Sequence, residues 1–481
     1  MPSSIWWIRR DLRLADNPAL NQALLHGAVI PVFILDDHLL LKPAAKRKNF
    51  LFEGLQNLDK DLRSRGSRLV LRRGEPLQEL NKLIVETGAD LISAEEDYSP
   101  YGRKRDASII RQLPLKLTGG LTLHHPLEVL KKDGTPYTIF TPYKNAWSAL
   151  PIIYNPNLGT PHQIQGNPQI QSLELPAYEN DLNFPASVSE ANDRLSRFIH
   201  ESIFKYANNR DLLACEDTSR LSPYLRFGIL SPSRAIGAAR IAVDSAPDVE
   251  ARKGAQVWLT ELIWREFYES ILFHFPFVLR MAFRPGLRQI EWGNSKNDLS
   301  AWQDGRTGYP VVDAGMRQLH QTGWMHNRAR MITASFVSKD LLINWQLGEA
   351  WFMQQLVDGD PASNNGGWQW AAGTGTDAAP YFRIFNPVLQ SKKFDPGGIY
   401  IRRWIPELAN VPDEFIHTPW LLPREEQKRI GCIIGKDYPN PIVDHSMARG
   451  RVLSAYRASV LLTNSLTDHK IDAERIEEEI R

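Results

Sequence analysis

The segment WLTELIWREFY, residues 258–268, brings together residue types that could do chemistry at the spacing of one helix face. Four side chains fall at positions i, i+3, i+4 and i+7 of a helix and so share a face: Glu261, Trp264, Arg265 and Tyr268. Such a face offers a flat indole for stacking and a carboxyl group that can hydrogen-bond or donate a proton. The alternative is a solvated Glu–Arg pair beside a half-buried tryptophan. That is the commoner use of these residues, and spacing alone does not decide between the two.

The stretch DGDPASNNGGWQWAAGTGTDAAPYFRIFNP, residues 358–387, surrounds Trp368 and Trp370 with Gly, Asn, Asp, Thr and Pro. These residue types favour turns, so we expect a loop here rather than a regular element. Two large aromatic side chains are out of place on an exposed loop. The composition therefore predicts a turn-rich loop that carries buried aromatics.

The segment CEDTSRLSPYLRFGILSPS, residues 215–233, places hydroxyl groups just before or at a predicted helix start: Thr218, Ser219 and Ser222. Hydroxyls and free backbone N–H groups at such a position can hold phosphates. Ordinary helix capping is the simpler role for any single serine. In MHNRARMITASF, residues 325–336, Asn327 and Met331 share a helix face with Arg330 beside them, which fits either a polar pocket floor or a surface.

Several well-known signatures are missing from the sequence. It contains no Walker A or G-x-G-x-x-G motif and no nucleophile elbow, so a classical hydrolase is not expected. The histidines are scattered, and Cys215 and Cys432 lie far apart, so no metal site is predicted. The 14 tryptophans include Trp292, Trp345 and Trp368. Core packing explains most tryptophans, although closely spaced indoles can also relay electrons.

Bulk composition indicates a soluble globular protein. The 481 residues are 43% hydrophobic and 23% charged, and the formal net charge is only +2, so any basic surface must be local. Two cysteines fit a reducing, cytoplasmic location. The N-terminus has no signal-peptide pattern, and no run of 18 apolar residues predicts a membrane span.

The order of elements predicts two domains. Short apolar runs, at 4–8, 28–35, 68–73, 90–94 and 121–125, alternate with helical patterns such as 51–62 and 75–88. This alternation predicts a doubly wound α/β domain with a parallel sheet over residues 1–135. Residues 136–188 are expected to be an interdomain linker, and 189–481 an all-α domain.

Taken together, the motifs resemble the DNA photolyase/cryptochrome family, and most closely the class I cyclobutane pyrimidine dimer photolyases. The resemblance rests on six blocks in the same order: RRDLRLADNPAL (9–20), EDTSRLSPYLRFG (216–228), ELIWREFY (261–268), GYPVVDAGMRQL (308–319), TGWMHNRARMITASFVSKDLLINW (322–345) and the 358–387 stretch. It implies an α/β antenna domain and a helical domain that holds FAD.

The resemblance also assigns roles to single residues. The FAD site would comprise Tyr206, Thr218, Ser219, Arg220, Leu221, Ser222, Trp258, Arg330, Asp358, Gly359, Asp360 and Asn364, with Arg330 paired to Asp358 and Asn364 next to flavin N5. Trp368, Trp345 and Trp292 would form an electron-transfer triad. Glu261, Asn327 and Met331 would contact a flipped pyrimidine dimer between Trp264 and Trp370, and Arg210, Arg265, Arg328 and Arg383 would face DNA phosphates.

The function implied is light-driven DNA repair. Fully reduced, photoexcited FAD would give an electron to a dimer that has left the DNA stack, and the cyclobutane ring would open, which makes the protein a carbon–carbon lyase. The alternative is a cryptochrome, a blue-light receptor without repair. Plant-type cryptochromes carry Asp at the position of Asn364, and (6-4) photolyases would show a His pair near 327–331, where this chain has Asn327 and Met331. A plain electron-transfer flavoprotein would need no DNA-facing Trp264 or Arg210.

A second, antenna chromophore is also implied. SPYGRKRDASI, residues 99–109, resembles photolyases that bind 8-hydroxy-5-deazaflavin or FMN, and Gly102 stands about where folate-binding relatives carry Glu. A solvated, basic helix start is the competing interpretation of the same residues. The expected partner is damaged DNA, with no membrane and no protein partner implied. We expect a monomer in the cytoplasm, at the bacterial nucleoid, or in another reducing compartment that contains DNA.

Overall fold

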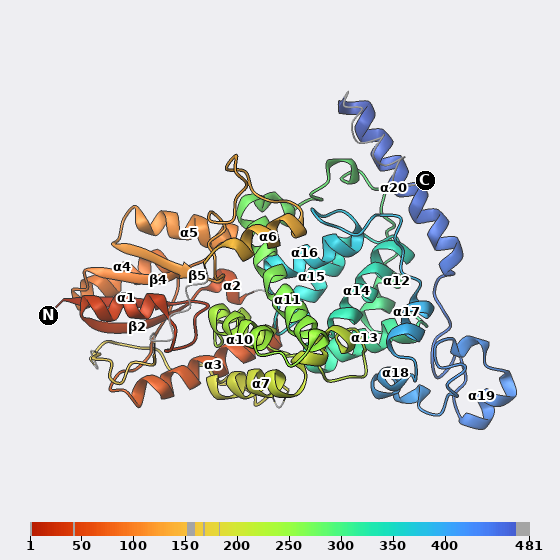
Figure 1. Ribbon diagram of the computed structural model, residues 1–481, viewed down its shortest axis with the longest axis horizontal. Helices are drawn as coiled ribbons and strands as arrows, with labels where there is room; N and C mark the ends of the chain where they lie inside the picture. The colour runs from red at the N-terminus through yellow and green to blue at the C-terminus, as the bar shows by residue number, and fades with distance from the viewer. Residues whose placement is uncertain (1, 42–43, 152–158, 167–168, 182, 468–481) are drawn as a thin grey trace. The chain divides into compact units, whose positions relative to one another are not determined.

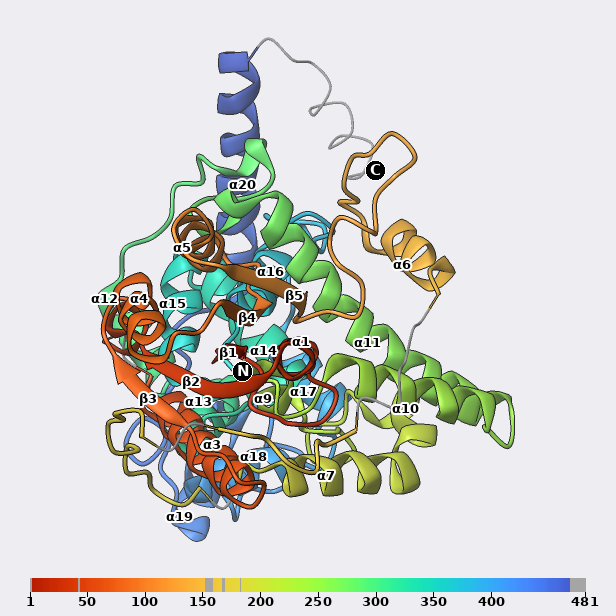
Figure 2. The same ribbon diagram turned by 90° about the vertical axis from the view of Figure 1, so that its left-hand side faces the viewer.

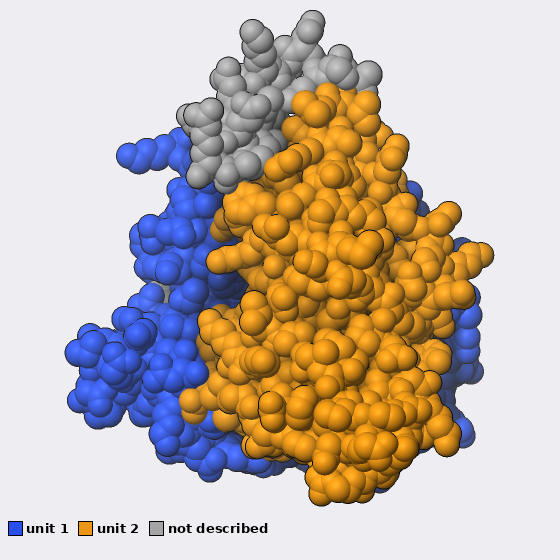
Figure 3. Space-filling model, turned by 90° about the vertical axis from the view of Figure 1, so that its right-hand side faces the viewer, with its two compact units in different colours: residues 1–208, 217–276, 357–362 blue, residues 209–216, 277–356, 363–481 orange. Residues whose placement is uncertain are grey.

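The protein is described by a computed structural model that covers residues 2–41, 44–151, 159–166, 169–181 and 183–467. The chain divides into two compact units, coloured separately in Figure 3. Unit 1 comprises residues 1–208, 217–276 and 357–362, and unit 2 comprises 209–216, 277–356 and 363–481. The predicted domain boundaries at 135 and 188 are drawn from changes in sequence composition, whereas these units are defined by compactness. The boundaries therefore stay a prediction.

Unit 1 begins with a parallel sheet in the strand order β3-β2-β1-β4-β5, as far as the described residues show (Figure 1, Figure 2). The strands are β1 (Ser3–Ile8), β2 (Ala28–Leu35), β3 (Val70–Arg73), β4 (Leu91–Glu96) and β5 (Leu115–Gly120). The helices around and after them are α1 (Pro18–His26), α2 (Asp37–Leu40), α3 (Ala45–Arg63), α4 (Pro76–Thr87), α5 (Pro100–Ile110) and α6 (Phe140–Ala149). The predicted α/β class is confirmed.

Alternate residues of the central strands explain why helices cover both faces of the sheet. Ile5 and Trp7 belong to a buried apolar cluster with Leu83 of α4 and Ile109 of α5. The hydroxyl of Ser4, on the opposite face, donates to the backbone oxygen of Ala23 in α1 at 3.0 Å. Because successive side chains of a strand point to opposite faces, β1 packs helices on both sides, as a doubly wound sheet requires.

The strand predicted at 121–125 is wrong. The fifth strand is β5, Leu115–Gly120, and residues 121–124 form bends after it. The N–H of Leu123 donates to Glu266 Oε1 at 2.5 Å, and the oxygen of Leu121 accepts from Arg265 Nη1 at 2.5 Å. These backbone groups therefore hydrogen-bond to side chains of the helix at residues 249–274, and not to a neighbouring strand.

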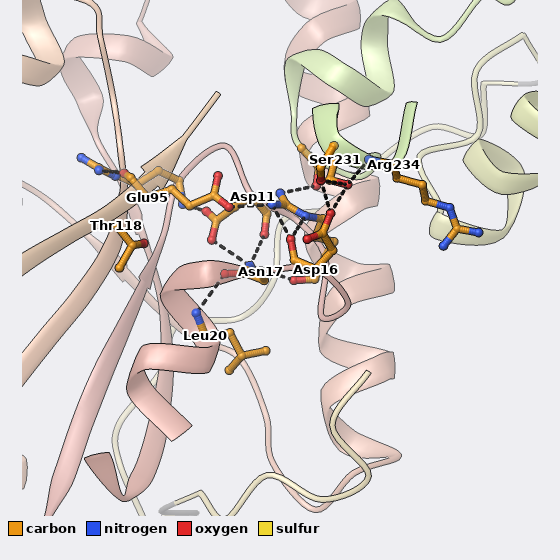
Figure 4. A network of polar contacts seen from close by, with 12 residues as sticks. Asp11, Asp16, Asn17, Leu20, Glu95, Thr118, Ser231 and Arg234 are labelled. Carbon is orange, nitrogen blue, oxygen red and sulfur yellow. Dashed lines mark hydrogen bonds and ion pairs between the residues drawn. The ribbon is translucent and has the colours of Figure 1, made fainter. Parts of the chain in front are cut away.

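The RRDLRLADNPAL motif is a structural joint within unit 1 (Figure 4). Arg13 Nη2 lies 2.6 Å from Glu95 Oε1 at the end of β4. Asp16, with a left-handed φ of 51°, accepts hydrogen bonds from Ser231 at 2.5 Å and from Ser233 at the start of α10. Burial, only partly offset by Arg13, raises the pKa of Glu95 to about 8. The motif thus ties the sheet to the start of α10.

Beyond residue 187, the described residues form helices and no strand, which confirms the predicted all-α region. The helices are α7 (Val188–Glu201), α8 (Tyr206–Asn209), α9 (Ser222–Arg226), α10 (Pro232–Asp244), α11 (Val249–His274), α12 (Lys296–Gln303), α13 (Pro310–Thr322), α14 (Asn327–Ser335), α15 (Trp345–Gln355), α16 (Pro361–Ala372), α17 (Pro387–Phe394), α18 (Ile399–Trp404), α19 (Arg424–Ile430) and α20 (His445–Thr467). Short 3-10 turns, including η1 (Ile203–Lys205), join some of them.

The loop predicted over 358–387 is wrong in its first half, where α16 spans Pro361–Ala372. Pro361 suits the first helical turn, and Asp360 Oδ1 accepts from the N–H of Ala362 at 3.1 Å. The amide of Asn365 donates to the oxygen of Val278 at 3.1 Å instead of competing with the helix backbone. Turn-forming residues therefore start this helix and anchor it, and irregular chain follows only after residue 372.

Candidate functional site

The face predicted on residues 258–268 is present on α11. Glu261, Trp264, Arg265 and Tyr268 are all half-buried, whereas Ile263 and Phe267 on the other side are buried. The indole of Trp264 stacks on the ring of Phe140, with centroids 3.6 Å apart and planes 8° apart. One face of this indole is therefore already covered by protein, and Glu261 lies one helical turn before it on the same side of α11.

Tyr206 and Trp258 come together in unit 1 on a shared aromatic ring. Phe198 of α7 lies 5.6 Å from Tyr206 and 4.9 Å from Trp258, measured between ring centroids. Gly254 makes this approach possible, because a Cβ there would lie 2.4 Å from the oxygen of Phe204 and 2.6 Å from that of Ile203. The turn before Tyr206 thus packs directly on the backbone of α11.

The hydroxyl run lies just before a helix, as its sequence predicts. Thr218 and Ser219 are half-buried, Leu221 is buried, and Ser222 is the first residue of α9. Arg220 between them has a left-handed φ of 49°, and its guanidinium lies over the ring of Phe184 at 5.1 Å. A left-handed arginine is uncommon, and here it turns the chain sharply between the hydroxyls and the helix.

The acidic segment 358–360 is held by two arginines. Arg10 Nη2 lies 2.6 Å from Asp360 Oδ2, and Arg226 Nε donates to the oxygen of Gly359 at 2.9 Å. Burial, with the nearby charge of Arg10, lowers the pKa of Arg226 to about 9. Both arginines stand in quoted motifs, yet the sequence analysis gave them no role. The signal for Arg10 is its place just beyond the carboxyl end of a central parallel strand.

Unit 2 holds the predicted polar residues of α14. The amide of Asn327 lies 3.9 Å from the sulfur of Met331, so the two share a face as predicted. Arg328 pairs with Asp211 at 2.6 Å and covers the ring of Phe394. Arg330 Nε donates to the oxygen of Met325 at 2.9 Å. The pairing predicted between Arg330 and Asp358 would join residues of different units, and it stays a prediction.

The three tryptophans of the predicted triad belong to one apolar region of unit 2. Trp345 and Trp368 are buried in a common cluster, and the half-buried Trp292 packs against it. Gly348 follows Trp345 by one helical turn on α15, and a Cβ at Gly348 would lie 2.1 Å from the Trp368 ring. The indole of Trp368 therefore lies on the face of α15 that carries Trp345.

Asn364 contacts an acid that the sequence analysis missed. Its amide donates to the backbone oxygen of Glu349 at 3.0 Å and to Glu349 Oε1 at 3.4 Å. Burial raises the pKa of Glu349 to about 7, although the hydrogen bond from Asn364 acts in the opposite direction. Glu349 stands in the apolar run LGEAWF, and a lone charge in such a run is the signal that could have drawn attention to it.

Comparison with known proteins decides the family. The model of the DNA photolyase family matches residues 4–161, and the model described as the FAD binding domain of DNA photolyase matches residues 258–458. The deoxyribodipyrimidine photo-lyase of Alkalihalophilus pseudofirmus is 40% identical over 477 residues, which cover 94% of this chain and 97% of that protein. The chain belongs to the DNA photolyase family.

Solved structures agree with this membership in the photolyase family. A bacterial class III photolyase from Agrobacterium tumefaciens superposes with a TM-score of 0.89 at 38% identity, covering 95% of this chain and 98% of its own. A cryptochrome from Synechocystis gives 0.86 at 30% identity, covering 95% and 99%. The photolyase fold thus extends over nearly the whole chain, and both branches of the family share it.

The remaining residues predicted for the site lie in unit 2. Trp370 is half-buried, with its ring 6.4 Å from that of Phe385. The guanidinium of Arg210 is 3.8 Å from Asp211, and Arg383 is exposed. Within the described ranges, no group of three or more His, Cys, Asp or Glu residues could hold a metal ion. No helix among these residues is long and apolar enough to cross a membrane.

Proposed function

We propose that this protein is a light-driven deoxyribodipyrimidine photo-lyase, which splits UV-induced cyclobutane pyrimidine dimers in DNA. The observation that carries the proposal is the α11 face, where the stacked indole of Trp264 shares a side of the helix with Glu261, one turn before it. A family of repair enzymes that matches the chain almost end to end supports the same conclusion. Neither line of support depends on net charge, which is only +2.

FAD is the cofactor that these residues fit. Bound and fully reduced FAD would supply light absorption and the electron for repair. The half-buried hydroxyls of Thr218 and Ser219, beside the left-handed Arg220, fit its phosphates. Asp358 and Asp360 would face the polar edge of the flavin and the ribityl side, on a segment where Arg226 holds the backbone oxygen of Gly359 and Arg10 holds the carboxyl of Asp360. The other residues proposed for the site are Tyr206, Leu221, Ser222, Trp258, Gly359, Arg330 and Asn364.

The substrate side is proposed on the same grounds. A dimer must leave the duplex stack before it can reach a buried cofactor, and its weakened pairing lowers that cost. Trp264, whose indole stacks on Phe140, would flank the flipped dimer, and Trp370 would flank it opposite. Glu261 would hydrogen-bond a pyrimidine carbonyl and stabilise its developing charge. Asn327 and Met331, already adjacent on α14, would complete the contact.

The protein's own part in photoreduction would be an electron path. We assign it to Trp368, Trp345 and Trp292, in order from cofactor to surface. Their burial fits this order, because Trp368 and Trp345 are buried and Trp292 is half-buried. The path would lie within unit 2, and its step between Trp368 and Trp345 would run along α15, where the Trp368 ring packs against Gly348.

An antenna chromophore would bind where the strand order of the sheet reverses, at the carboxyl ends of the strands. Tyr101 stacks on His38 there, with centroids 4.6 Å apart, and its hydroxyl donates to Asp36. A flat chromophore such as 8-hydroxy-5-deazaflavin or FMN suits these rings. Folate is disfavoured, because Gly102 lacks the carboxyl that folate-binding relatives carry about there, and a Cβ at Gly102 would meet the Asp97 side chain at 2.5 Å. An absorption spectrum of the purified protein would identify the chromophore.

The setting follows from the proposed substrate. A repair enzyme acts where the DNA is, so we place the protein in the cytoplasm at the nucleoid, or in another reducing compartment that contains DNA. We propose that it acts as a monomer. The cryptochrome alternative is supported by the Synechocystis structure. Asn364 in place of Asp, together with Asn327 and Met331, favours repair.

The deciding experiment is repair in light. Fully reduced, FAD-loaded protein under near-UV or blue light should restore thymine oligomers that contain dimers. Glu261→Ala should lower the quantum yield of repair while the oligomer still binds, and Glu261→Gln, which keeps a hydrogen-bonding group, should fall between the two. Absence of repair by the reduced, FAD-loaded wild type would overturn the enzyme and favour the light receptor.

A further inference from the structure

A buried charge network in unit 1 reaches from the sheet to the proposed cofactor segment. Arg10 follows β1 by two residues, and its side chain is only 13% exposed. Its Nη2 is 2.6 Å from Asp360 Oδ2 and 3.8 Å from Glu269 Oε1, and its Nε donates to the oxygen of Arg226 at 3.3 Å. One guanidinium thus faces two carboxyl groups on different segments.

Both carboxylate oxygens of Asp360 accept hydrogen bonds. Oδ2 meets Arg10, and Oδ1 accepts the N–H of Ala362 in the first turn of α16. Asn364 stands four residues beyond Asp360 on the same helix. The orientation of Asp360 therefore bears on the cofactor segment 358–360 and on the start of the helix that carries Asn364.

Glu269 is the second acceptor that Arg10 faces. Glu269 lies on α11, about two helical turns after Glu261, and it is only 1% exposed. Its Oε1 has no hydrogen-bond partner among the described residues, because Arg10 at 3.8 Å is too distant. A buried carboxyl oxygen without a hydrogen bond is costly, and the cost is greatest when the group is charged.

We infer that Arg10 is a positioning residue for the cofactor, which holds Asp360 and the start of α16 in place, and that Glu269 competes for Arg10 when it loses its proton. This inference rests on the proposed function, because it takes 358–360 as the FAD-facing segment. It deepens that function by adding two residues that do not touch the cofactor themselves.

The competition of Glu269 with Asp360 for Arg10 should increase as the pH rises. The groups that face Glu269 are Asp360, Arg10, Arg265, Asp97 and Tyr98. Burial raises the pKa of Glu269 to about 7, and the charge of Asp360 raises it further, against the pull of Arg10 and Arg265. Below pH 6 Glu269 is neutral, and the ion pair of Arg10 is with Asp360. Above pH 8 Glu269 is ionised, and it and Asp360 share the guanidinium of Arg10, while Arg226 Nε lies 3.7 Å from Asp360 Oδ2.

The first test is FAD release from the holoenzyme, followed by flavin fluorescence after dilution. Arg10→Gln should release FAD at least tenfold faster than the wild type. Arg13→Gln is the matched control, because it removes another buried arginine of the same segment, paired with Glu95 rather than Asp360. It should leave FAD release unchanged even where it lowers the melting temperature. Equal release by Arg10→Gln and the wild type would overturn the inference.

The second test does not require Arg10→Gln to fold. The FAD dissociation constant of the wild type should rise severalfold between pH 6 and pH 8, and in Glu269→Gln it should stay at its pH 6 value. A Glu269→Gln profile that still rises as in the wild type would overturn the inference. The proposed function fails in a different way, because then the reduced, FAD-loaded wild type would give no repair in light, whatever its FAD dissociation constant at pH 6 and pH 8.

Discussion

Glu349 shows what burial does to one acid close to the proposed flavin position. Its pKa is raised to about 7, first by burial, while an exposed glutamate titrates near 4.3. Between these values the folded protein binds a proton that the unfolded chain has released. The stabilising contribution of the protonated form is therefore complete below about pH 4 and is lost as the pH rises through 7.

Glu349→Gln should remove this pH dependence, because the amide stays neutral and keeps a partner for Asn364. Relative to this variant, the wild type should lose about 2–3 kcal/mol of unfolding free energy between pH 4 and pH 8. Urea unfolding of both proteins at these two pH values measures the difference. Glu425→Gln, which alters an exposed acid, should track the wild type. A parallel pH dependence for Glu349→Gln would show that the carboxyl is ionised throughout.

The residue scale also shows what sequence can and cannot predict. The half-buried stripe of Glu261, Trp264 and Arg265 follows directly from a period of 3.6 residues. The role proposed for Asn364 comes from the resemblance of its whole block to a known family, and it stays a prediction. The sequence did not predict Glu349 and Arg10, because their importance comes from burial and from partners distant in sequence. Asp360, for example, lies 350 residues after Arg10.

At the scale of elements, the two mistaken predictions have one physical cause. Local composition describes the backbone preference of a segment, whereas the element that forms depends on where its backbone hydrogen bonds go. Residues 121–125 have the pattern of a strand, but Glu266 of α11 takes the N–H of Leu123. Residues 361–372 are rich in turn formers, but Asp360 and the anchored Asn365 let them form α16. Glu266 lies far from residues 121–125 in the sequence, Asp360 lies just before residues 361–372, and Asn365 is anchored by the distant Val278.

Gly254 offers a test of how helix packing shapes the proposed cofactor site. Gly254→Ala would place a Cβ 2.4 Å from the oxygen of Phe204, and a backbone atom cannot rotate away. We expect α11 and the turn before Tyr206 to separate, which should cost about 1–3 kcal/mol of stability and weaken FAD binding severalfold. Thermal unfolding and FAD titration of the apoprotein measure these effects.

A neighbouring substitution separates packing from helix propensity at this position. Lys253→Ala changes an exposed residue of α11 whose ammonium lies 3.8 Å from Glu250. It should leave both stability and FAD affinity close to those of the wild type. If Gly254→Ala behaved like Lys253→Ala, the contact between α11 and η1 would not support the cofactor site.

At the scale of the whole molecule, DNA binding must come from local charge. The net charge of +2 gives little long-range attraction, so a few arginines have to supply the phosphate contacts. The structure separates the candidates. The charge of Arg328 is already paired with Asp211, and Arg265 is engaged with the backbone of Leu121. Arg383 is exposed, which makes it the clearest candidate for a direct phosphate contact.

Arg383→Ala should therefore weaken binding to dimer-containing DNA and reduce the slope of log K against log salt by about 1, because one phosphate contact releases about one counterion. The loop itself should persist, since Lys339 Nζ donates to the backbone oxygen of Arg383 at 2.9 Å and does not depend on its side chain. Arg429→Ala removes an exposed arginine that is paired with Glu426 at 2.6 Å, and it should leave the slope unchanged. Titrations at several salt concentrations compare the three proteins. An unchanged slope for Arg383→Ala would move the phosphate contacts to other arginines, with Arg210 the next to test.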